Sequence, residues 1–205
     1  MEKFYLEAPG IERKDEAFDY IREFQEYGSK INGAGGLNHF LTDYEGWLRM
    51  TAERAVMEPN EERVPAREFF LVRENDNRIV GMINIRTALN EKMRKHGGHI
   101  GYSIRPTERG KGYNKINLYL GLKVCKQYGI KTVMLDADLD NPASWRTMEA
   151  LGGVRVREYF DSEDSGKDVV VYHIDTERAL SEHPEYEEMV AESQETPLLR
   201  RYLKD

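Results

Sequence analysis

The stretch "HIGYSIRPTERGKGYNKI", residues 99–116, decides the fold of this chain. It opens with an apolar run typical of a buried strand, which ends at Pro106, and it closes on a helix start. Between them lies a basic loop with two glycines, Gly110 and Gly112. Glycines let the backbone approach a phosphate, and the free N–H groups of a helix start point at the anion. The order of strand, glycine loop and helix predicts an anion-binding loop, although a solvated basic turn that caps the helix has the same signature.

Apolar spacing and turn residues predict the elements on both sides of this stretch. They place strands at 4–8, 67–75, 78–89, 98–106, 131–139, 154–160 and 167–174, and helices at 12–27, 42–56, 112–128 and 141–151. Thr42 and Glu45 have the spacing of a capping box for the second helix. The helix at 112–128 serves as a crossover between two strands. This order predicts an α+β fold with a mixed, largely antiparallel central sheet flanked by helices.

The length of 205 residues fits one domain with a sizeable core. We expect that domain at 1–175, followed by an acidic C-terminal extension at 176–205. The extension carries eight acidic and four basic residues, and its segment "PEYEEMVAESQET", residues 184–196, is expected to form one acidic helix. Such an extension makes a homodimer contact plausible.

Three features of the sequence bear on the expected cellular location. No apolar run approaches the length that spans a bilayer, and the N-terminal residues lack the basic start and apolar core of a signal peptide. The single cysteine, Cys125, cannot form an internal disulfide, which suits a reducing compartment. We therefore expect a cytoplasmic protein with no membrane partner.

Charge is unevenly placed along the chain. The net charge is -7, yet residues 105–131 hold seven lysines or arginines against one acid, Glu108. A polynucleotide binder is usually basic over a whole face, whereas a small basic island fits a compact polyanion such as a nucleotide cofactor. We expect no nucleic-acid partner.

Two familiar phosphate loops are excluded by single positions. A Walker A loop requires Ser or Thr after its Gly-Lys pair, and Gly112 is followed here by Tyr113. The dinucleotide fingerprint requires a third glycine where this chain has Lys115. The loop nevertheless follows the carboxyl end of a strand and precedes a crossover helix, which is where open sheets commonly bind ligands.

The loop resembles the signature of the GNAT (GCN5-related) N-acetyltransferases, Gln/Arg-x-x-Gly-x-Gly/Ala after a strand that ends in apolar-x-Pro. Residues 109–114 match it in the first five places, and Asn114 stands where the family has Gly or Ala. The resemblance implies that backbone amides of the loop bind the pyrophosphate of acetyl-CoA, and that the strand backbone pairs with the pantetheine arm. The implied loop residues are Arg109, Gly110, Lys111, Gly112, Tyr113 and Asn114, and the implied strand residues are Ser103 and Ile104.

The stretch "NPASWRTMEALGG", residues 141–153, is similar to the helix of the same family that lies beside the pantetheine. The resemblance implies that Asn141 hydrogen-bonds the cofactor arm and that Ser144 lies near the thiol. Asn141 is also explained as the N-cap of the helix. Many family members have a tyrosine seven residues after the Asn, where this chain has Met148, which cannot donate a proton. Ser144 or a water is left as the proton donor.

The base that deprotonates the acceptor amine is expected on the strand before the loop. Some family members have a carboxylate near the position of His99, and imidazole exchanges protons near neutral pH. His99 is therefore the candidate base, Tyr102 is a fallback proton donor, and His96 is expected to face the opposite side of the strand.

Three acids alternate along the strand at 131–139 and beyond it: Asp136, Asp138 and Asp140. A calcium loop requires Gly and Glu where this chain has Asn141 and Thr147, so we expect no metal. The acids either line an acceptor groove that favours a cationic amine or form a solvated strand end. The glycine-rich segment at 32–36 is either a substrate lid or a flexible surface connection.

The resemblance implies an acetyl-CoA-dependent N-acetyltransferase, which we expect to transfer acetyl directly to an amine of a small molecule or protein in a ternary complex. Cys125 is expected to be buried on a helix and is not a nucleophile. Two alternatives stay open. One is a non-catalytic module of the same fold that binds acyl-CoA or CoA as a sensor, and the other is a nucleotide-binding regulator unrelated to CoA.

Overall fold

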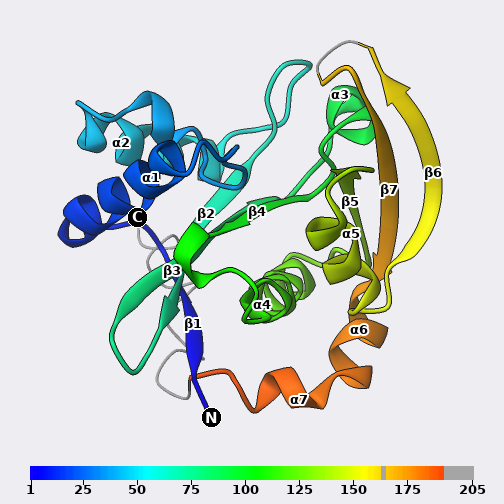
Figure 1. Ribbon diagram of the computed structural model, residues 1–205. Helices are drawn as coiled ribbons and strands as arrows, with labels where there is room; N and C mark the ends of the chain where they lie inside the picture. Colours follow the sequence, from blue (N-terminus) through cyan, green and yellow to red (C-terminus); the bar gives the residue numbers. More distant parts are fainter. Residues whose placement is uncertain (163–164, 192–205) are drawn as a thin grey trace.

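The computed structural model describes residues 1–162 and 165–191, and it has the predicted α+β architecture (Figure 1). In chain order the elements are β1 (Phe4–Glu7), η1 (Ile11–Arg13), α1 (Lys14–Glu26), η2 (Leu37–His39), α2 (Tyr44–Val56), β2 (Ala66–Arg73), β3 (Arg78–Arg86), α3 (Glu91–Lys95), β4 (Ile100–Ile104), η3 (Pro106–Glu108), α4 (Tyr113–Gln127), β5 (Thr132–Asp138), α5 (Pro142–Glu149), β6 (Val154–Asp161), β7 (Lys167–Asp175), α6 (Thr176–Glu182) and α7 (Pro184–Glu187). Every strand and helix predicted from the apolar spacing of residues 4–174 is present. In the part of the chain that the structure describes, no helix is both long and apolar enough to cross a bilayer.

The central sheet is split into two antiparallel sheets with the strand orders β1-β2-β3-β4 and β5-β7-β6. The two sheets meet at His99, whose backbone N–H donates to the carbonyl of Met134 at 2.7 Å. The Nδ1 atom of His99 accepts a hydrogen bond from the Met134 N–H at 3.0 Å. Beyond this contact β4 and β5 form no ladder within the described residues, and Figure 1 shows them diverging toward α4 and α5. The divergence leaves the loop after β4 open to solvent.

Two apolar cores lie on opposite faces of the first sheet. One core joins β4, α4 and the second sheet through residues such as Ile104, Leu118 and Val170. The other lies beneath α1 and α2 and includes Trp47 and Phe70. Side chains alternate between the two faces of a strand, so neighbouring positions on β2, such as Phe69 and Phe70, serve different cores. The face that carries Ile104 also carries Tyr102.

The start of α2 differs from the predicted capping box. Asp43, and not Thr42, is the N-cap, and its Oδ1 accepts a hydrogen bond from the Gly46 N–H at 2.8 Å. Carboxylate caps satisfy the same free N–H groups that a Thr–Glu pair would. The predicted helix is therefore confirmed, with a start one residue later and a different cap.

The short helix α3 was not predicted. Its N-cap, Asn90, accepts a hydrogen bond from the Met93 N–H at 2.8 Å, and the helix ends at Lys95 with His96 as its C-cap. Asn90 was the available signal, because Asn is favoured at N-caps. His96 is consequently not a strand residue, and the prediction that it lies opposite His99 on one strand was wrong.

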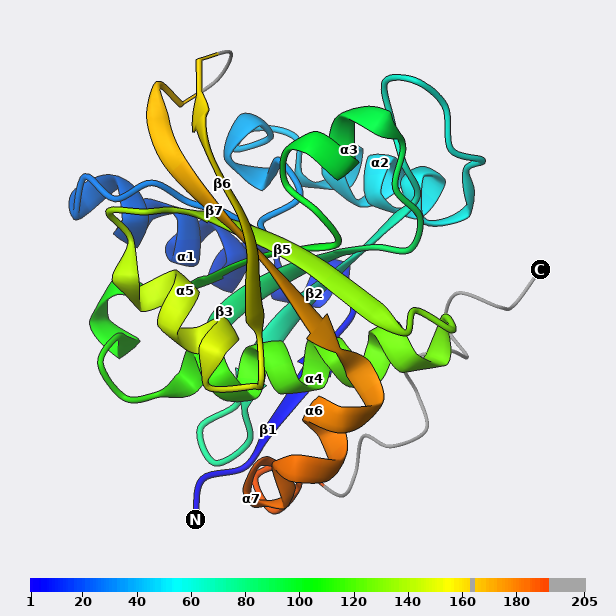
Figure 2. The same ribbon diagram turned by 90° about the vertical axis from the view of Figure 1, so that its right-hand side faces the viewer.

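The described part of the C-terminal extension packs on the domain. Glu187 of α7 accepts hydrogen bonds from Tyr119 Oη at 2.9 Å and from Lys123 Nζ at 2.6 Å, both on α4. The chain then runs beside β1, where the Phe4 N–H donates to the Met189 carbonyl at 2.8 Å. Figure 2 shows α7 next to the N-terminal strand. The acidic helix predicted at 184–196 thus ends at Glu187 because the backbone pairs with β1 instead, and its last five positions lie outside the described residues.

Candidate functional site

A cleft of about 550 Å³ opens between β4, the first turn of α4 and α5. It brings together nine of the cofactor residues predicted from sequence: Ser103, Ile104, Arg109, Gly110, Gly112, Tyr113, Asn114, Asn141 and Ser144. Lys111 is not among the residues that line it. We call this cavity the cofactor cleft.

The loop backbone presents unused donors to the cofactor cleft. Gly110 and Gly112 have φ angles of 78° and 81°, in the left-handed region that glycine adopts without strain. No described residue accepts a hydrogen bond from the amides of 110–114. Successive free N–H groups around left-handed glycines form a concave anion site, and the start of α4 adds its dipole. The loop therefore fits a pyrophosphate through its main chain.

The cationic side chains of the loop are already engaged. Lys111 Nζ donates to Glu108 Oε2 at 2.7 Å. Arg109 donates to the Ile104 carbonyl at 3.2 Å and to Ser29 Oγ at 2.8 Å. These contacts hold the loop in shape, and they leave the amides of 110–114 as the loop donors without a partner among the described residues.

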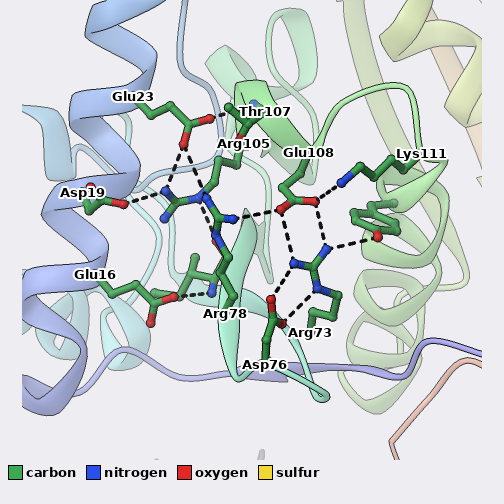
Figure 3. Close-up of polar contacts among 12 residues, drawn as sticks. Glu16, Asp19, Glu23, Arg73, Asp76, Arg78, Arg105, Thr107, Glu108 and Lys111 are labelled. Atoms are coloured by element: carbon green, nitrogen blue, oxygen red, sulfur yellow. Dashed lines mark hydrogen bonds and ion pairs between the residues drawn. The ribbon is translucent and has the colours of Figure 1, made fainter.

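Beneath the loop, Glu108 is the centre of a buried ion network (Figure 3). Its carboxylate is 3% exposed and pairs with Arg73 at 2.9 Å, with Arg78 at 3.2 Å and with Lys111. Burial raises the pKa of Glu108, but the hydrogen bonds from Lys111 and Arg73 outweigh it, so the net pKa lies below the ordinary value. Arg73 also reaches Tyr113 Oη at 3.2 Å, which ties the network to the first turn of α4.

A second ion cluster ties α1 to the same loop (Figure 3). Arg105, 1% exposed, pairs with Asp19 at 2.7 Å and with Glu23 at 3.0 Å. Glu23 also accepts the Thr107 N–H at 2.7 Å, at the start of the loop. From the sequence, Arg105 belongs to the basic island expected to bind a polyanion. In the structure Arg105 is buried and paired with Asp19 and Glu23 instead.

Glu108→Gln is expected to lower the free energy of unfolding by about 2 kcal/mol at neutral pH, because it removes the buried carboxylate that Arg73, Arg78 and Lys111 share and leaves Asp76 as the close counter-charge of Arg73. The pKa of Glu108 is depressed in the folded chain, so its contribution is present above the unfolded pKa of about 4.3 and is lost as the pH falls through the folded value. Urea unfolding at neutral pH and at a pH below about 4 checks this. A difference between variant and wild type that is the same at both pH values argues against the network.

Helix α5 brings Ser144 to Tyr102 at the inner end of the cofactor cleft. Tyr102 Oη donates to the Ser144 carbonyl at 3.1 Å and lies 3.1 Å from Ser144 Oγ. Burial raises the pKa of Tyr102, so its hydroxyl stays protonated. Met148 is 1% exposed and belongs to the core. A buried tyrosine hydroxyl thus lies beside Ser144, and it comes from β4 and not from position 148.

Asn141 and Asn114 take roles that the sequence left open. Asn141 occupies the N-cap position of α5, yet its side chain makes no capping hydrogen bond and faces the cofactor cleft. Asn114 Nδ2 lies 3.4 Å from Thr147 Oγ1 on α5, while its buried Oδ1 has no hydrogen-bond partner among the described residues. The Asn141 side chain therefore has polar atoms available to a ligand, whereas the Asn114 side-chain oxygen is buried.

A second cavity of about 580 Å³ lies on the other side of Tyr102, between α3, β5, β6 and the loop after α1. We call it the acceptor cavity. Both cavities are lined by Lys30, Asn32, Tyr102, Asp138, Asn141 and Ser144. The two cavities therefore meet at the Tyr102–Ser144 contact, so a reactant in each would meet there.

Two of the three alternating acids line the acceptor cavity. Asp136 and Asp138 lie on it, whereas Asp140 lines only the cofactor cleft and pairs with Lys167 at 2.8 Å. Asp136 Oδ2 accepts the Gly97 N–H at 2.5 Å, and burial raises its pKa above the ordinary value. Within residues 1–162 and 165–191, no three His, Cys, Asp or Glu side chains converge in a way that would hold a metal ion.

His99 lies apart from both cavities, among the described lining residues of neither. Its Nδ1 accepts the Met134 N–H, which joins the two sheets. Burial lowers the pKa of His99 to about 4, and the charges of Arg94 and Arg86 add to the effect. An imidazole used in this way is neutral and structural, and the geometry does not bring His99 together with Ser144.

The glycine-rich segment at 32–36 closes one end of the acceptor cavity. Ser103 Oγ donates to the Asn32 carbonyl at 2.6 Å, and Trp47 Nε1 donates to the Gly35 carbonyl at 3.1 Å. A Cβ at Gly33 would lie 2.4 Å from the Gly101 carbonyl oxygen, so the loop touches β4 where only glycine fits. Contacts with β4 and with Trp47 of α2 therefore hold the segment against the first sheet.

Glu68 is buried under this segment. It is 3% exposed, accepts a hydrogen bond from Asn84 and has no described partner for its Oε2. Burial raises the pKa of Glu68 to about 8. The folded chain therefore binds more protons than the unfolded chain between pH about 4.3 and the folded value, so stability falls as the pH rises through this window.

Glu68→Gln is expected to raise the free energy of unfolding by a few kcal/mol near the upper end of that window and by little at its lower end. The amide keeps the acceptor for Asn84 and removes the ionisation that burial opposes. Chemical unfolding of variant and wild type across the window measures the difference. A gain that does not depend on pH is evidence that Glu68 is ionised in the folded chain.

Comparison with known proteins agrees with the resemblance seen in the sequence. The model of the Acetyltransferase (GNAT) family matches residues 36–152, more than half of the chain. A search of curated proteins finds no match. Among solved structures, a chimera of the spermidine N-acetyltransferase SpeG from Vibrio cholerae and hSSAT has a TM-score of 0.60 at 14% identity, with 87% of this chain and 98% of that chain covered.

Two further solved structures share the fold. The ribosomal-protein-S5-alanine acetyltransferase from Vibrio fischeri has a TM-score of 0.60 at 15% identity, covering 86% of this chain and 94% of its own. The microcin C7 self-immunity acetyltransferase MccE, solved with acetyl-CoA and AMP, has a TM-score of 0.60 at 15% identity, with 84% and 92% covered. The matched residues include the strand, the glycine loop and α5, and the chain belongs to the Acetyltransferase (GNAT) family.

Proposed function

We propose that this chain is an acetyl-CoA-dependent N-acetyltransferase that transfers acetyl directly to an amine in a ternary complex. The observation that carries the proposal is the junction of the cofactor cleft and the acceptor cavity at Tyr102 and Ser144. Direct transfer needs both reactants in contact, and two cavities that share one wall allow this. Cys125 is fully buried and burial raises its pKa to about 12, which argues against a covalent cysteine intermediate.

The cofactor cleft fits acetyl-CoA through its main chain. We propose that the amides of 110–114 bind the pyrophosphate, that the β4 backbone at Ser103 and Ile104 pairs with the pantetheine, and that Asn141 hydrogen-bonds the arm. When bound, acetyl-CoA supplies an activated acetyl thioester. The backbone amides of 110–114 have no partner among the described residues, and the Asn141 side chain makes no capping hydrogen bond. These groups are the proposed hydrogen-bond donors to acetyl-CoA.

Tyr102 is the proposed proton donor to the departing sulfur. Its hydroxyl is protonated because burial raises its pKa, and the contacts with Ser144 fix its position. Ser144 is proposed to orient Tyr102 and to lie near the thiol. A group that donates one proton at the right place typically contributes a large factor to the rate.

The acceptor is proposed to be an amine that is cationic in solution. Asp136 and Asp138 line the acceptor cavity, and carboxylates favour a positively charged ligand. The solved relatives are named for spermidine and for an alanine of ribosomal protein S5, so the fold accommodates both small and protein acceptors. We also propose a cytoplasmic location, because the chain has a single cysteine. The acidic C-terminal segment is the basis for proposing a homodimer.

A thermal-shift comparison of acetyl-CoA, CoA and ATP tests the cofactor assignment. A ligand that binds only the folded chain raises its melting temperature by mass action. We expect acetyl-CoA and CoA to raise it and ATP to raise it less. A shift with ATP alone would favour a nucleotide-binding regulator and would exclude both CoA-dependent readings.

A further inference from the structure

We infer that His96 is the general base of the transfer, held in place by Asp161 and Tyr159. The inference rests on the proposed function, since a base is needed only if an amine is acetylated here. It concerns residues that lie on the acceptor cavity and outside the cofactor cleft.

The three side chains come from two separate parts of the fold and meet on the acceptor cavity. His96 follows α3, whereas Tyr159 and Asp161 lie on β6. His96 Nδ1 lies 2.9 Å from Tyr159 Oη and 3.8 Å from Asp161 Oδ1, and the two rings pack edge to face at 5.3 Å. Asp161 is 5% exposed, and its Oδ2 accepts the Ser165 N–H at 2.9 Å. Asp161 is therefore buried and held in a fixed position by the hairpin.

Both contacts reach the same ring nitrogen of His96. The other nitrogen, Nε2, makes no hydrogen bond to any described residue, and His96 lines the cavity. When Nδ1 carries a hydrogen that faces Tyr159 and Asp161, Nε2 presents a lone pair. This is the arrangement in which a carboxylate orients a histidine that takes a proton from a third group.

His99, the base expected from the sequence, is less suited to this role, and the turn that carries His96 is held by the side chains around it. His99 has its Nδ1 engaged by Met134 and lies outside the cavity. Asp136 accepts the Gly97 N–H, directly beside His96 in the chain, which anchors the turn that carries the imidazole. The Arg86 guanidinium donates to the Gly97 and Gly98 carbonyls, both at 3.0 Å, and fixes the same turn. The turn after α3 is therefore held rigidly, with His96 at its start.

The proton balance of the step is complete without another reactant. The acceptor enters as an ammonium and gives one proton to His96 Nε2. The neutral amine then forms the N–C bond to the acetyl carbon, the C–S bond breaks, and the sulfur takes the proton of Tyr102. The second proton of the amine passes to solvent, which also reprotonates Tyr102 and discharges His96. The products are an acetamide, a free thiol and one proton.

The test compares two acceptors that differ in charge but hardly in size. One is the primary alkylamine on which the full-length wild type shows the highest turnover. The other is its analogue with two fluorine atoms on the carbon next to the aminomethyl group, assayed at a pH at which the fluorinated amine is largely neutral and the alkylamine is still largely protonated. We expect His96→Gln to lower kcat/KM for the alkylamine about 100-fold and to leave that for the fluorinated amine unchanged. Asp161→Asn is expected to show the same selectivity with a loss of about tenfold, as for a positioning residue.

Binding provides a readout that does not depend on turnover. The dissociation constant of the alkylamine, measured by calorimetry with CoA present, is expected to be the same in His96→Gln and wild type. His173→Gln, at an exposed position on β7, is the matched control and is expected to change none of these values.

The outcomes separate this inference from the proposed function. Equal losses on both amines, or none on either, would overturn the role of His96 while leaving the transferase intact. Absence of wild-type turnover on every amine would overturn both.

Discussion

Tyr102→Phe is expected to lower kcat at least about 100-fold, the lower end of the range for loss of a positioned proton donor. The hydroxyl of Tyr102 lies at the junction of the two cavities, 3.1 Å from Ser144 Oγ. The departing thiolate has no nearby tyrosine from α5, because position 148 is a buried methionine. Affinity for acetyl-CoA is expected to stay unchanged, because the phosphate contacts lie at the other end of the cleft.

Steady-state kinetics and acetyl-CoA titration of the same preparation measure the two effects separately. Tyr172→Phe is the matched control, because it also removes a buried hydroxyl, one that donates to Glu149 at 2.8 Å away from both cavities. The control is expected to lose stability of about 1 kcal/mol and no activity per folded molecule. Full kcat in Tyr102→Phe would contradict the prediction and would mean that Ser144 or a water donates the proton.

Gly112→Val is expected to raise the dissociation constant for acetyl-CoA at least about tenfold, equivalent to about 1.4 kcal/mol. Its φ of 81° lies in the region that β-branched residues adopt only with strain, so the loop would rearrange its amides. A Cβ at this position meets nothing within 4 Å, so the effect arises from the backbone conformation and not from a clash inside the protein.

Gly129→Val separates this effect from general destabilisation. Gly129 follows α4, has a φ of 70° and likewise offers open space to a Cβ, but it does not line the cofactor cleft. Calorimetric titration and thermal melts are expected to show similar losses of stability in the two variants and a loss of acetyl-CoA affinity in Gly112→Val alone. Equal affinities would mean that the loop amides do not bind the ligand.

The cofactor cleft was predictable because its residues are local in sequence. The strand, Gly110 and Gly112 stand within one stretch, and the chemistry of positive φ and free amides requires no distant partner. The motif at Asn141 adds the facing helix. These two segments lie on either side of the split between the sheets, which is why they come together in one cleft.

The network beneath the loop was not predictable because its partners are far apart in the chain. Arg73 and Glu108 are separated by 35 positions, and Asp19 and Arg105 by 86. Charge counting assigned Arg105 and Lys111 to the ligand, but a buried carboxylate or a neighbouring helix neutralises each of them. Which charge meets which depends on the fold and leaves no pattern in the sequence.

The roles of the two histidines depended on a helix that the sequence did not reveal. His96 and His99 are three residues apart, and strand alternation was the basis for choosing between them. In the structure α3 ends just before His96, and the sheets join at His99. The difference between a buried structural imidazole and one on a cavity therefore follows from α3 and from the split between β4 and β5.

The most direct test of the central claim is the release of CoA thiol when the full chain is mixed with acetyl-CoA and a panel of primary amines. We predict release that requires both the protein and an amine, with one acetylated amine detected by mass spectrometry for each thiol formed. Binding of acetyl-CoA without amine-dependent thiol release on any member of the panel would contradict the proposal and identify a non-catalytic CoA-binding module.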